Sequence, residues 1–207
     1  MKMDFREMMG DRSVWPIIAS NVLTIVIALY QGWNIIIPML IYWFQSATIG
    51  FFNFLRMLSL KDFSVEGLHS HGKTPPANRT TKITLALFFA LHYGGFHMVY
   101  LFFLLGGALF YLREVISSLP YVLLLFAMFF MSHLFSFIQN NKRESRGQNI
   151  GKMMLYPYVR IIPMHLTLVF GGLLMNHSAT ILFLLLKTVA DVVMHGIEHS
   201  TLRKAGA

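Results

Sequence analysis

Five ionisable side chains interrupt the last apolar run of the chain, and their spacing places them along one stripe of a helix. Lys187, Asp191, His195 and His199 follow one another at four-residue steps, with Glu198 beside them. Residues four apart face the same side of a helix. A carboxylate and an imidazole at this spacing can hold a metal ion together. The alternative is an ion pair between Lys187 and Asp191, with His195 hydrogen-bonded to a neighbouring helix.

Four further histidines lie in three earlier apolar runs. Depth is measured at ~1.5 Å per residue from the end of each helix that the charge pattern described below places in the cytoplasm. His92 lies ~17 Å from that end of its helix, and His133 and His165 lie ~10 Å from theirs. On the last helix, His195 lies at ~8 Å and Asp191 at ~14 Å, whereas His97 lies higher, at ~24 Å. An ionisable group in lipid costs at least ~2.5–3.5 kcal/mol, so groups at a shared depth are expected to meet one another or a ligand. We therefore predict a buried site with these candidate metal ligands: His92, His97, His133, His165, Asp191 and His195.

The local sequence around each histidine leaves alternatives open. His92 and His97 are five apart, which separates them by about 140° on a regular helix. The Gly94–Gly95 pair allows a close helix approach or a π-bulge that would realign the two rings. Depth favours His92 for the site. His133 is as well explained by a hydrogen bond to a serine or a backbone carbonyl as by metal ligation.

Imidazole and carboxylate ligands suit zinc first, with iron or manganese as alternatives. The chain has no cysteine, so thiolate sites are excluded. A zinc site with an open position can activate water for hydrolysis. The proton-transfer group would be Glu198, Asp191 or a spare histidine, and the substrate a lipid or another membrane-embedded molecule. Whether the protein is an enzyme stays open.

Two other functions compete with a metal-dependent hydrolase. A haem protein would use a histidine pair at matched depth on two helices, a test that His133 and His165 meet. An ion or proton pathway would use Asp191 and the histidines as a relay. The shortage of ionisable groups in the outer half of the bundle, where Lys187 near the middle is the exception, weighs against a continuous path.

The elements that must position these groups are apolar runs. Of the 207 residues, 56% are hydrophobic and 13% are charged, and the mean hydropathy is +0.58. A soluble domain carries about 25% charged residues. We predict one all-α domain over residues 1–207, a polytopic membrane bundle with six transmembrane helices. Their approximate ranges are 14–30, 35–56, 82–110, 119–139, 158–175 and 179–199.

The net charge of +8 is distributed unevenly between the connections. Basic residues gather before the first run, in the second and fourth connections and at the chain end, whereas the alternate connections hold only Arg113. This is the positive-inside pattern, and it places both termini in the cytoplasm. Basic loops of this kind face anionic lipid, so the bilayer is the expected partner and nucleic acid is not. The oligomeric state is not indicated.

The remaining polar side chains are expected to have structural roles. His69 and His71, in the long second connection, read as residues of a solvated loop rather than a metal site. The amides and hydroxyls of the first two runs, among them Ser46 and Asn53, are expected to form interhelical hydrogen bonds.

Two resemblances follow from the motifs. The "HGIEH" that ends the last run is similar to the HxxxH of alkaline-ceramidase-like intramembrane zinc hydrolases. That family also has a serine four residues before an earlier histidine, where this chain has Phe129 before His133, and it has seven spans. The segments "YWFQSATIGFFNFLRM", "HYGGFH", "PYVRIIPMH" and "KTVADVVMH" together resemble an uncharacterised family of six-span prokaryotic membrane proteins. This resemblance implies a prokaryotic inner membrane and no particular activity.

Overall fold

The computed structural model describes residues 22, 25, 26, 30, 32–69, 72–171 and 181–193. The elements are α3 (Ile36–Ser59), β1 (Asp62–Ser64), α4 (Arg79–Phe110), α5 (Leu112–Glu144), β2 (Arg146–Asn149), α6 (Ile150–Leu155), the 3-10 helix η1 (Tyr156–Arg160) and α7 (Ile161–Gly171). Residues 181–193 are also helical. The chain divides into two compact units, which we call the first unit (residues 1–38 and 159–207) and the second unit (residues 39–158).

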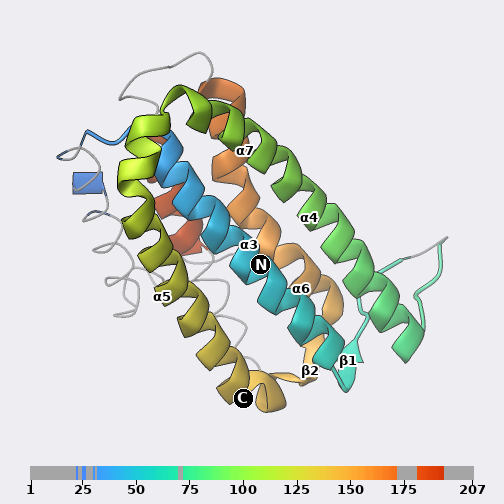
Figure 1. The fold of residues 1–207 in the computed structure, drawn as a ribbon. Helices are drawn as coiled ribbons and strands as arrows, with labels where there is room; N and C mark the ends of the chain where they lie inside the picture. Colours follow the sequence, from blue (N-terminus) through green and yellow to red (C-terminus); the bar gives the residue numbers. More distant parts are fainter. Residues whose placement is uncertain are drawn as a thin grey trace, which may run out of the picture. The chain divides into compact units, whose positions relative to one another are not determined.

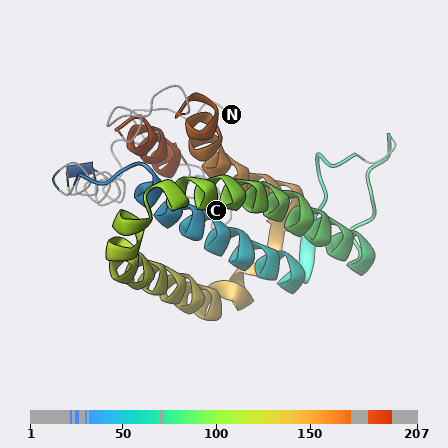
Figure 2. The ribbon, with the colours of Figure 1, turned by 45° about the horizontal axis from the view of Figure 1, so that its top comes forward.

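In the second unit, α3 lies between α4 and α5 (Figures 1 and 2). On its α4 side, the hydroxyls of Ser46 and Tyr93 are 2.8 Å apart, and Trp43 Nε1 donates to the carbonyl of His97 at 2.8 Å. Ser46 and Tyr93 are both buried. The interhelical hydrogen bond expected of Ser46 is confirmed, and so is that of Asn53, whose Nδ2 donates to the carbonyl of Met153 on α6 at 3.0 Å.

The opposite side of α3 packs on α5 through aromatic rings. Phe44 contacts Phe126 with ring centroids 4.7 Å apart, and Phe52 contacts Phe130 with centroids 5.3 Å apart. Offset or tilted pairs at these separations stabilise by about 0.5–1.5 kcal/mol beyond the area they bury. The core of the second unit therefore follows both sides of α3.

The helix ends near β1 and β2 are joined by hydrogen bonds. α4 begins after Asn78, whose side chain accepts from the Thr81 backbone N–H at 2.9 Å, which is an N-cap. β1 pairs in parallel with β2. The all-α expectation omitted this small sheet, which ties the chain after α3 to the chain after α5.

The expectation of six transmembrane helices is wrong. Among the described residues, two helical stretches are long and apolar enough to cross a membrane, Arg79–Phe110 and Leu112–Asn141. α3 is interrupted by polar side chains such as Gln45 and Asn53. Within the described residues, α7 covers 11 residues, fewer than the ~20 that a bilayer requires. The run expected at 14–30 lies almost wholly outside the described residues.

Candidate functional site

Three charged side chains of the first unit form one ion-pair network. Arg160 Nη1 lies 2.9 Å from Asp191 Oδ1, and Lys187 Nζ lies 2.7 Å from Asp191 Oδ2. The three side chains are 18%, 12% and 14% exposed for Arg160, Asp191 and Lys187. Each carboxylate oxygen thus accepts from a different cation in a largely buried setting.

Two helices position this network. Lys187 and Asp191 are one turn apart in the helix at 181–193, so their side chains meet on one face. Arg160 is the last residue of η1, immediately before α7. A lysine placed N-terminal to its acid is the less favourable orientation for helix stability. The pair is therefore not explained by stabilisation of its own helix.

The network carries surplus positive charge. Arg160 and Lys187 are the cations and Asp191 the acid in the part of the first unit that the structure describes. One guanidinium nitrogen, Arg160 Nε, is buried and has no acceptor among the described residues. A buried donor without an acceptor is costly, by about 1–3 kcal/mol or more for a charged group. A bound anion would accept a hydrogen bond from Arg160 Nε and would also offset the positive charge of Arg160 and Lys187.

The sequence leaves two alternatives open for Asp191, an ion pair with Lys187 and metal ligation. The structure has the ion pair. His195, Glu198 and His199 lie outside the described residues. A cation at Asp191 would have to displace or approach an arginine and a lysine, which repel it. The geometry at Asp191 thus favours the ion pair.

The histidines of the second unit lie in separate surroundings. His97 is 5% exposed and its Nδ1 lies 2.9 Å from the Tyr93 carbonyl. His133 makes the same contact with the Phe129 carbonyl at 3.1 Å. A carbonyl only accepts, so Nδ1 carries the proton in both rings. In His97 this leaves the lone pair on Nε2, which is buried and has no hydrogen-bond partner among the described residues.

His97 and His133 contact α3 at different levels. The His97 ring contacts Trp43, and the His133 ring contacts Phe52, each with centroids 6.2 Å apart. Trp43 and Phe52 are nine residues apart on α3, a distance of ~13 Å along the helix axis. The two imidazoles are therefore at different levels, as their expected depths also implied.

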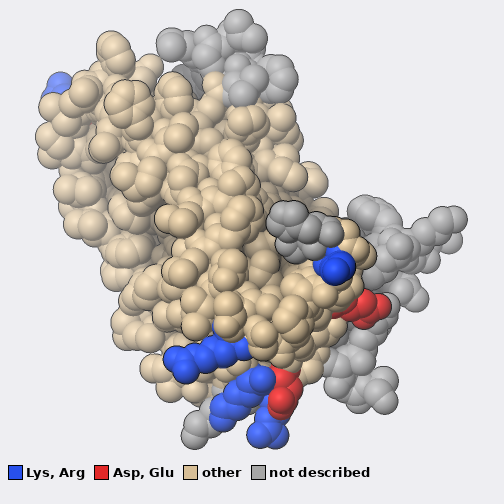
Figure 3. All heavy atoms as spheres, turned by 90° about the vertical axis from the view of Figure 1, so that its right-hand side faces the viewer, with Lys and Arg blue, Asp and Glu red and all other residues tan. Residues whose placement is uncertain are grey.

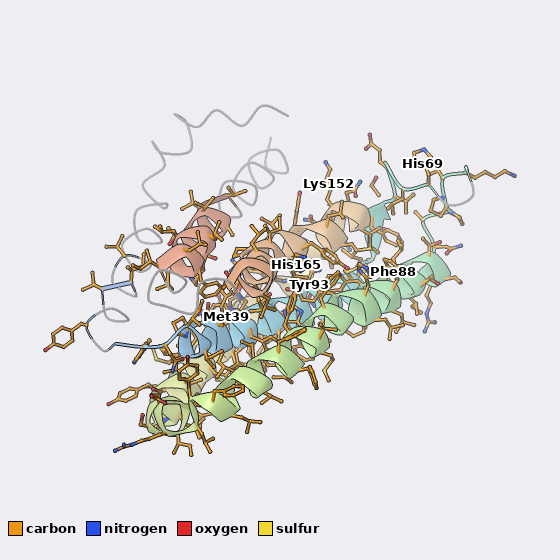
Figure 4. All side chains as sticks on the ribbon, turned by 90° about the horizontal axis from the view of Figure 1, so that it is seen from above. Met39, His69, Phe88, Tyr93, Lys152 and His165 are labelled. Carbon is orange, nitrogen blue, oxygen red and sulfur yellow. The ribbon has the colours of Figure 1, made fainter. Side chains whose placement is uncertain are left out.

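His92 and His165 are exposed. His92 Nδ1 lies 2.7 Å from the hydroxyl of Tyr158. Of the two histidines on α4, His97 is buried and His92 is exposed, whereas depth alone had favoured His92 for the site. His165 lies on α7 (Figure 4). Among the described residues, no three histidines, aspartates or glutamates are grouped as metal ligands. The six-residue metal site stays a prediction that this geometry does not support.

Sequence reasoning did not single out Arg160. Its signal was present, because a lone arginine inside "YPYVRIIPM" interrupts an apolar run as Lys187 and Asp191 do. An ionisable residue in such a run usually has an opposite charge as its partner. The partner lies 31 residues further along the chain, which local spacing does not reveal.

A family model described as a family of unknown function, DUF6498, matches residues 3–207. The chain therefore belongs to this family, and the expected membership of an uncharacterised family is confirmed. The similarity of "HGIEH" to the ceramidase-like hydrolases stays a prediction. No curated protein and no solved structure matches the chain.

Proposed function

We propose that this member of a family of unknown function is a membrane protein that binds a small anion at Arg160 and Lys187. The observation that carries the proposal is the charge of the network: one carboxylate is shared by two cations, and the buried Arg160 Nε has no acceptor among the described residues. Arginine suits oxyanions because its planar donors match carboxylate and phosphate oxygens.

The membrane placement is supported by α4 and α5. Within the apolar stretch of α5, 6% of the residues are buried inside the structure, and 28% in that of α4. Large side chains such as Phe102, Leu109 and Phe110 are 76%, 73% and 87% exposed. Soluble monomers rarely expose contiguous apolar surface of this kind. A bilayer would cover it.

The charge distribution of the second unit supports an orientation. The helix ends next to β1 and β2 carry most of its basic residues, whereas the first turn of α5 has Arg113 beside Glu114. The positive-inside rule then places the β1–β2 end at the cytoplasmic face. A prokaryotic inner membrane, implied by the resemblance of the motifs, stays a prediction.

Asp191 has a definite role in an anion site. It accepts from both Arg160 and Lys187, so it holds these two described cations together when the ligand is absent and offsets part of their positive charge. Two neighbouring cations without a counter-charge would repel each other strongly in a largely buried setting. An anion that enters would share these donors with the carboxylate. Asp191 therefore limits the affinity while it stabilises the empty site.

The experiment is a titration of inorganic phosphate into the detergent-purified full chain, with thermal unfolding as the readout and sodium chloride to hold ionic strength constant. A ligand that binds the folded state raises the unfolding temperature with its concentration. We expect saturable stabilisation of the unmodified protein. Arg160→Gln and Lys187→Gln should abolish it, and Arg113→Gln, which removes an exposed cation in the first turn of α5, should not.

Asp191→Asn separates this function from the alternatives. Removing the carboxylate takes away the acceptor that Arg160 and Lys187 share, so the apparent affinity for phosphate should rise by roughly tenfold. A metal site or a proton relay at Asp191 would lose its function in the same variant. The proposal is overturned if phosphate fails to stabilise the unmodified protein, or if Asp191→Asn and Lys187→Gln abolish binding alike.

A further inference from the structure

A second group of charged residues belongs to the second unit, whereas Arg160, Lys187 and Asp191 belong to the first unit. We define the basic end by these residues: Arg56, Lys61, Lys73, Arg79, Lys82, Arg146 and Lys152. Asp62 and Glu66 are the acids whose side chains are described there. We propose that the basic end binds the phosphate groups of anionic membrane lipids, an inference that rests on the membrane placement proposed above.

Hydrogen bonds bring the parts of the basic end together. The backbone N–H of Lys61 donates to the Ser145 carbonyl at 2.8 Å, which joins the chain after α3 to the end of α5. Lys82 Nζ donates to the Leu60 carbonyl at 2.7 Å, which joins the start of α4 to the end of α3. The loop that carries His69 leaves this end, opposite to Met39 near the start of α3 (Figure 4).

Four of these cations have no ionic partner among the residues that the structure describes. The side chains of Lys61, Lys73, Arg79 and Lys152 are exposed and form no ion pair within the described ranges. Arg146 pairs with Asp62 at 3.7 Å, but both side chains are more than 70% exposed, so that pair contributes little. Figure 3 shows most of the charged side chains of the face it draws towards its lower end, beside a broad uncharged surface, with basic atoms also visible at its upper left.

The position of Arg79 is not explained by helix stability. Arg79 and Lys82 lie in the first turn of α4, which has no acidic residue. Cations are unfavourable at a helix N-terminus because the helix dipole is positive there. A lipid phosphate next to this turn would offset both the side-chain charges and the dipole.

The lengths of the two candidate spans put these cations at headgroup depth. α4 has 32 residues, which extend over ~48 Å, against ~30 Å for the hydrocarbon core and ~40–45 Å with the headgroups. The exposed apolar surface of α4 begins at Leu87 and Phe88, ~12 Å along the axis from Arg79. With the apolar surface in the hydrocarbon, the backbone of Arg79 lies a few ångströms beyond the headgroup layer, which is ~5–7.5 Å thick on each side. The long arginine side chain can reach back to the lipid phosphates.

The test uses the detergent-purified full chain, titrated with mixed micelles of phosphatidylglycerol or of phosphatidylcholine, and thermal unfolding as the readout. We expect saturable stabilisation by phosphatidylglycerol and none by phosphatidylcholine. Neutralising one exposed cation, as in Lys61→Gln, Lys73→Gln, Arg79→Gln or Lys152→Gln, should weaken apparent binding about fivefold. The fourfold variant should abolish it, and Arg113→Gln at the opposite end should match the unmodified protein.

Two further arms identify the source of the phosphate and keep this inference separate from the anion site. In Arg160→Gln, which lacks the proposed anion site, free glycerol phosphate should not reproduce the stabilisation by phosphatidylglycerol, and an equal effect there would overturn binding to lipid. Arg160→Gln should leave the phosphatidylglycerol effect intact. The opposite result would be loss of the stabilisation by phosphatidylglycerol in Arg160→Gln and its retention in the fourfold variant. That result would overturn the basic end as the lipid site, and it would leave the proposed anion site standing.

Discussion

Arg160 and Asp191 are 31 positions apart in the chain, yet Arg160 Nη1 lies 2.9 Å from Asp191 Oδ1. The contact joins the start of α7 to the helix at 181–193. Both side chains are less than a fifth exposed, so water screens the pair weakly. The contact therefore couples the stability of two segments of the first unit that are distant in the chain.

The first prediction concerns this coupling. Arg160→Gln should lower the free energy of unfolding by about 1–3 kcal/mol, because it leaves Asp191 with Lys187 as its described cation. In the double variant Arg160→Gln/Asp191→Asn, the losses should be less than additive by about 0.5–3 kcal/mol. Thermal or denaturant unfolding of the two single variants and the double variant measures the difference. Strict additivity would show that the two side chains do not interact.

The second prediction concerns the contact between α3 and α4. A Cβ at Gly50 would overlap the ring of Tyr93, which is buried and hydrogen-bonded to Ser46. Gly50→Ala should therefore destabilise the second unit by about 1–3 kcal/mol through overpacking. Gly95 is the matched control, because a Cβ there meets nothing within 4 Å.

At Gly95 the helix preference of alanine is not opposed by a clash. Gly95→Ala should be neutral or stabilising by about 0.5–1 kcal/mol. Unfolding temperatures of the two variants in the same detergent test the contrast. Equal effects at Gly50 and Gly95 would mean that the close approach of α3 and α4 at Tyr93 does not limit packing.

The helices were largely predictable from the chain, because their apolar runs are long. The run expected over 82–110 is α4, and that over 35–56 is α3. Counting six spans failed because apolar length was treated as sufficient. α3 carries amides on the surface that packs on its neighbours, and the run expected over 158–175 starts in a 3-10 helix. The β1–β2 pairing could not be expected from its strands, because "DFS" alternates over three residues only and "RGQN" does not alternate.

The site was predictable in part. Four-residue spacing indicated the pair of Lys187 with Asp191, because contacts within one helix follow from periodicity. Arg160 came from another segment, and no local pattern links positions 31 apart. Depth indicated His92, but the direction that a side chain faces depends on neighbouring helices. Trp43 and Tyr100 enclose His97, whereas His92 is exposed.

The third prediction addresses the metal hypothesis. Asp191 already accepts from two cations, so we expect the zinc, iron and manganese contents of the purified protein to be independent of it. Elemental analysis of the unmodified protein and of Asp191→Asn, purified in parallel, makes the comparison. A near-stoichiometric metal that disappears in Asp191→Asn would contradict the ion-pair assignment and favour ligation by Asp191 with His195.

The fourth prediction concerns Tyr158, which lies between α6 and α7 and contacts the exposed His92. Burial raises the pKa of the Tyr158 hydroxyl above its usual value of 10.0. Because the folded-state pKa is raised, the neutral phenol is favoured by folding. The stability that this contributes is fully present below the unfolded value and is lost as pH rises through the folded pKa.

We therefore expect the unfolding temperature to fall with rising pH in the alkaline range above 10.0, and to fall less in Tyr158→Phe. The near-ultraviolet difference spectrum between the two proteins should show one phenolate that ionises later than a free tyrosine. Because His92 Nδ1 lies 2.7 Å from this hydroxyl, His92→Phe should alter the ionisation of Tyr158 while leaving its ring packed on Phe89. If the phenolate removed by Tyr158→Phe ionised at the usual value, the phenol would be solvated, and its contact with His92 would not persist in solution.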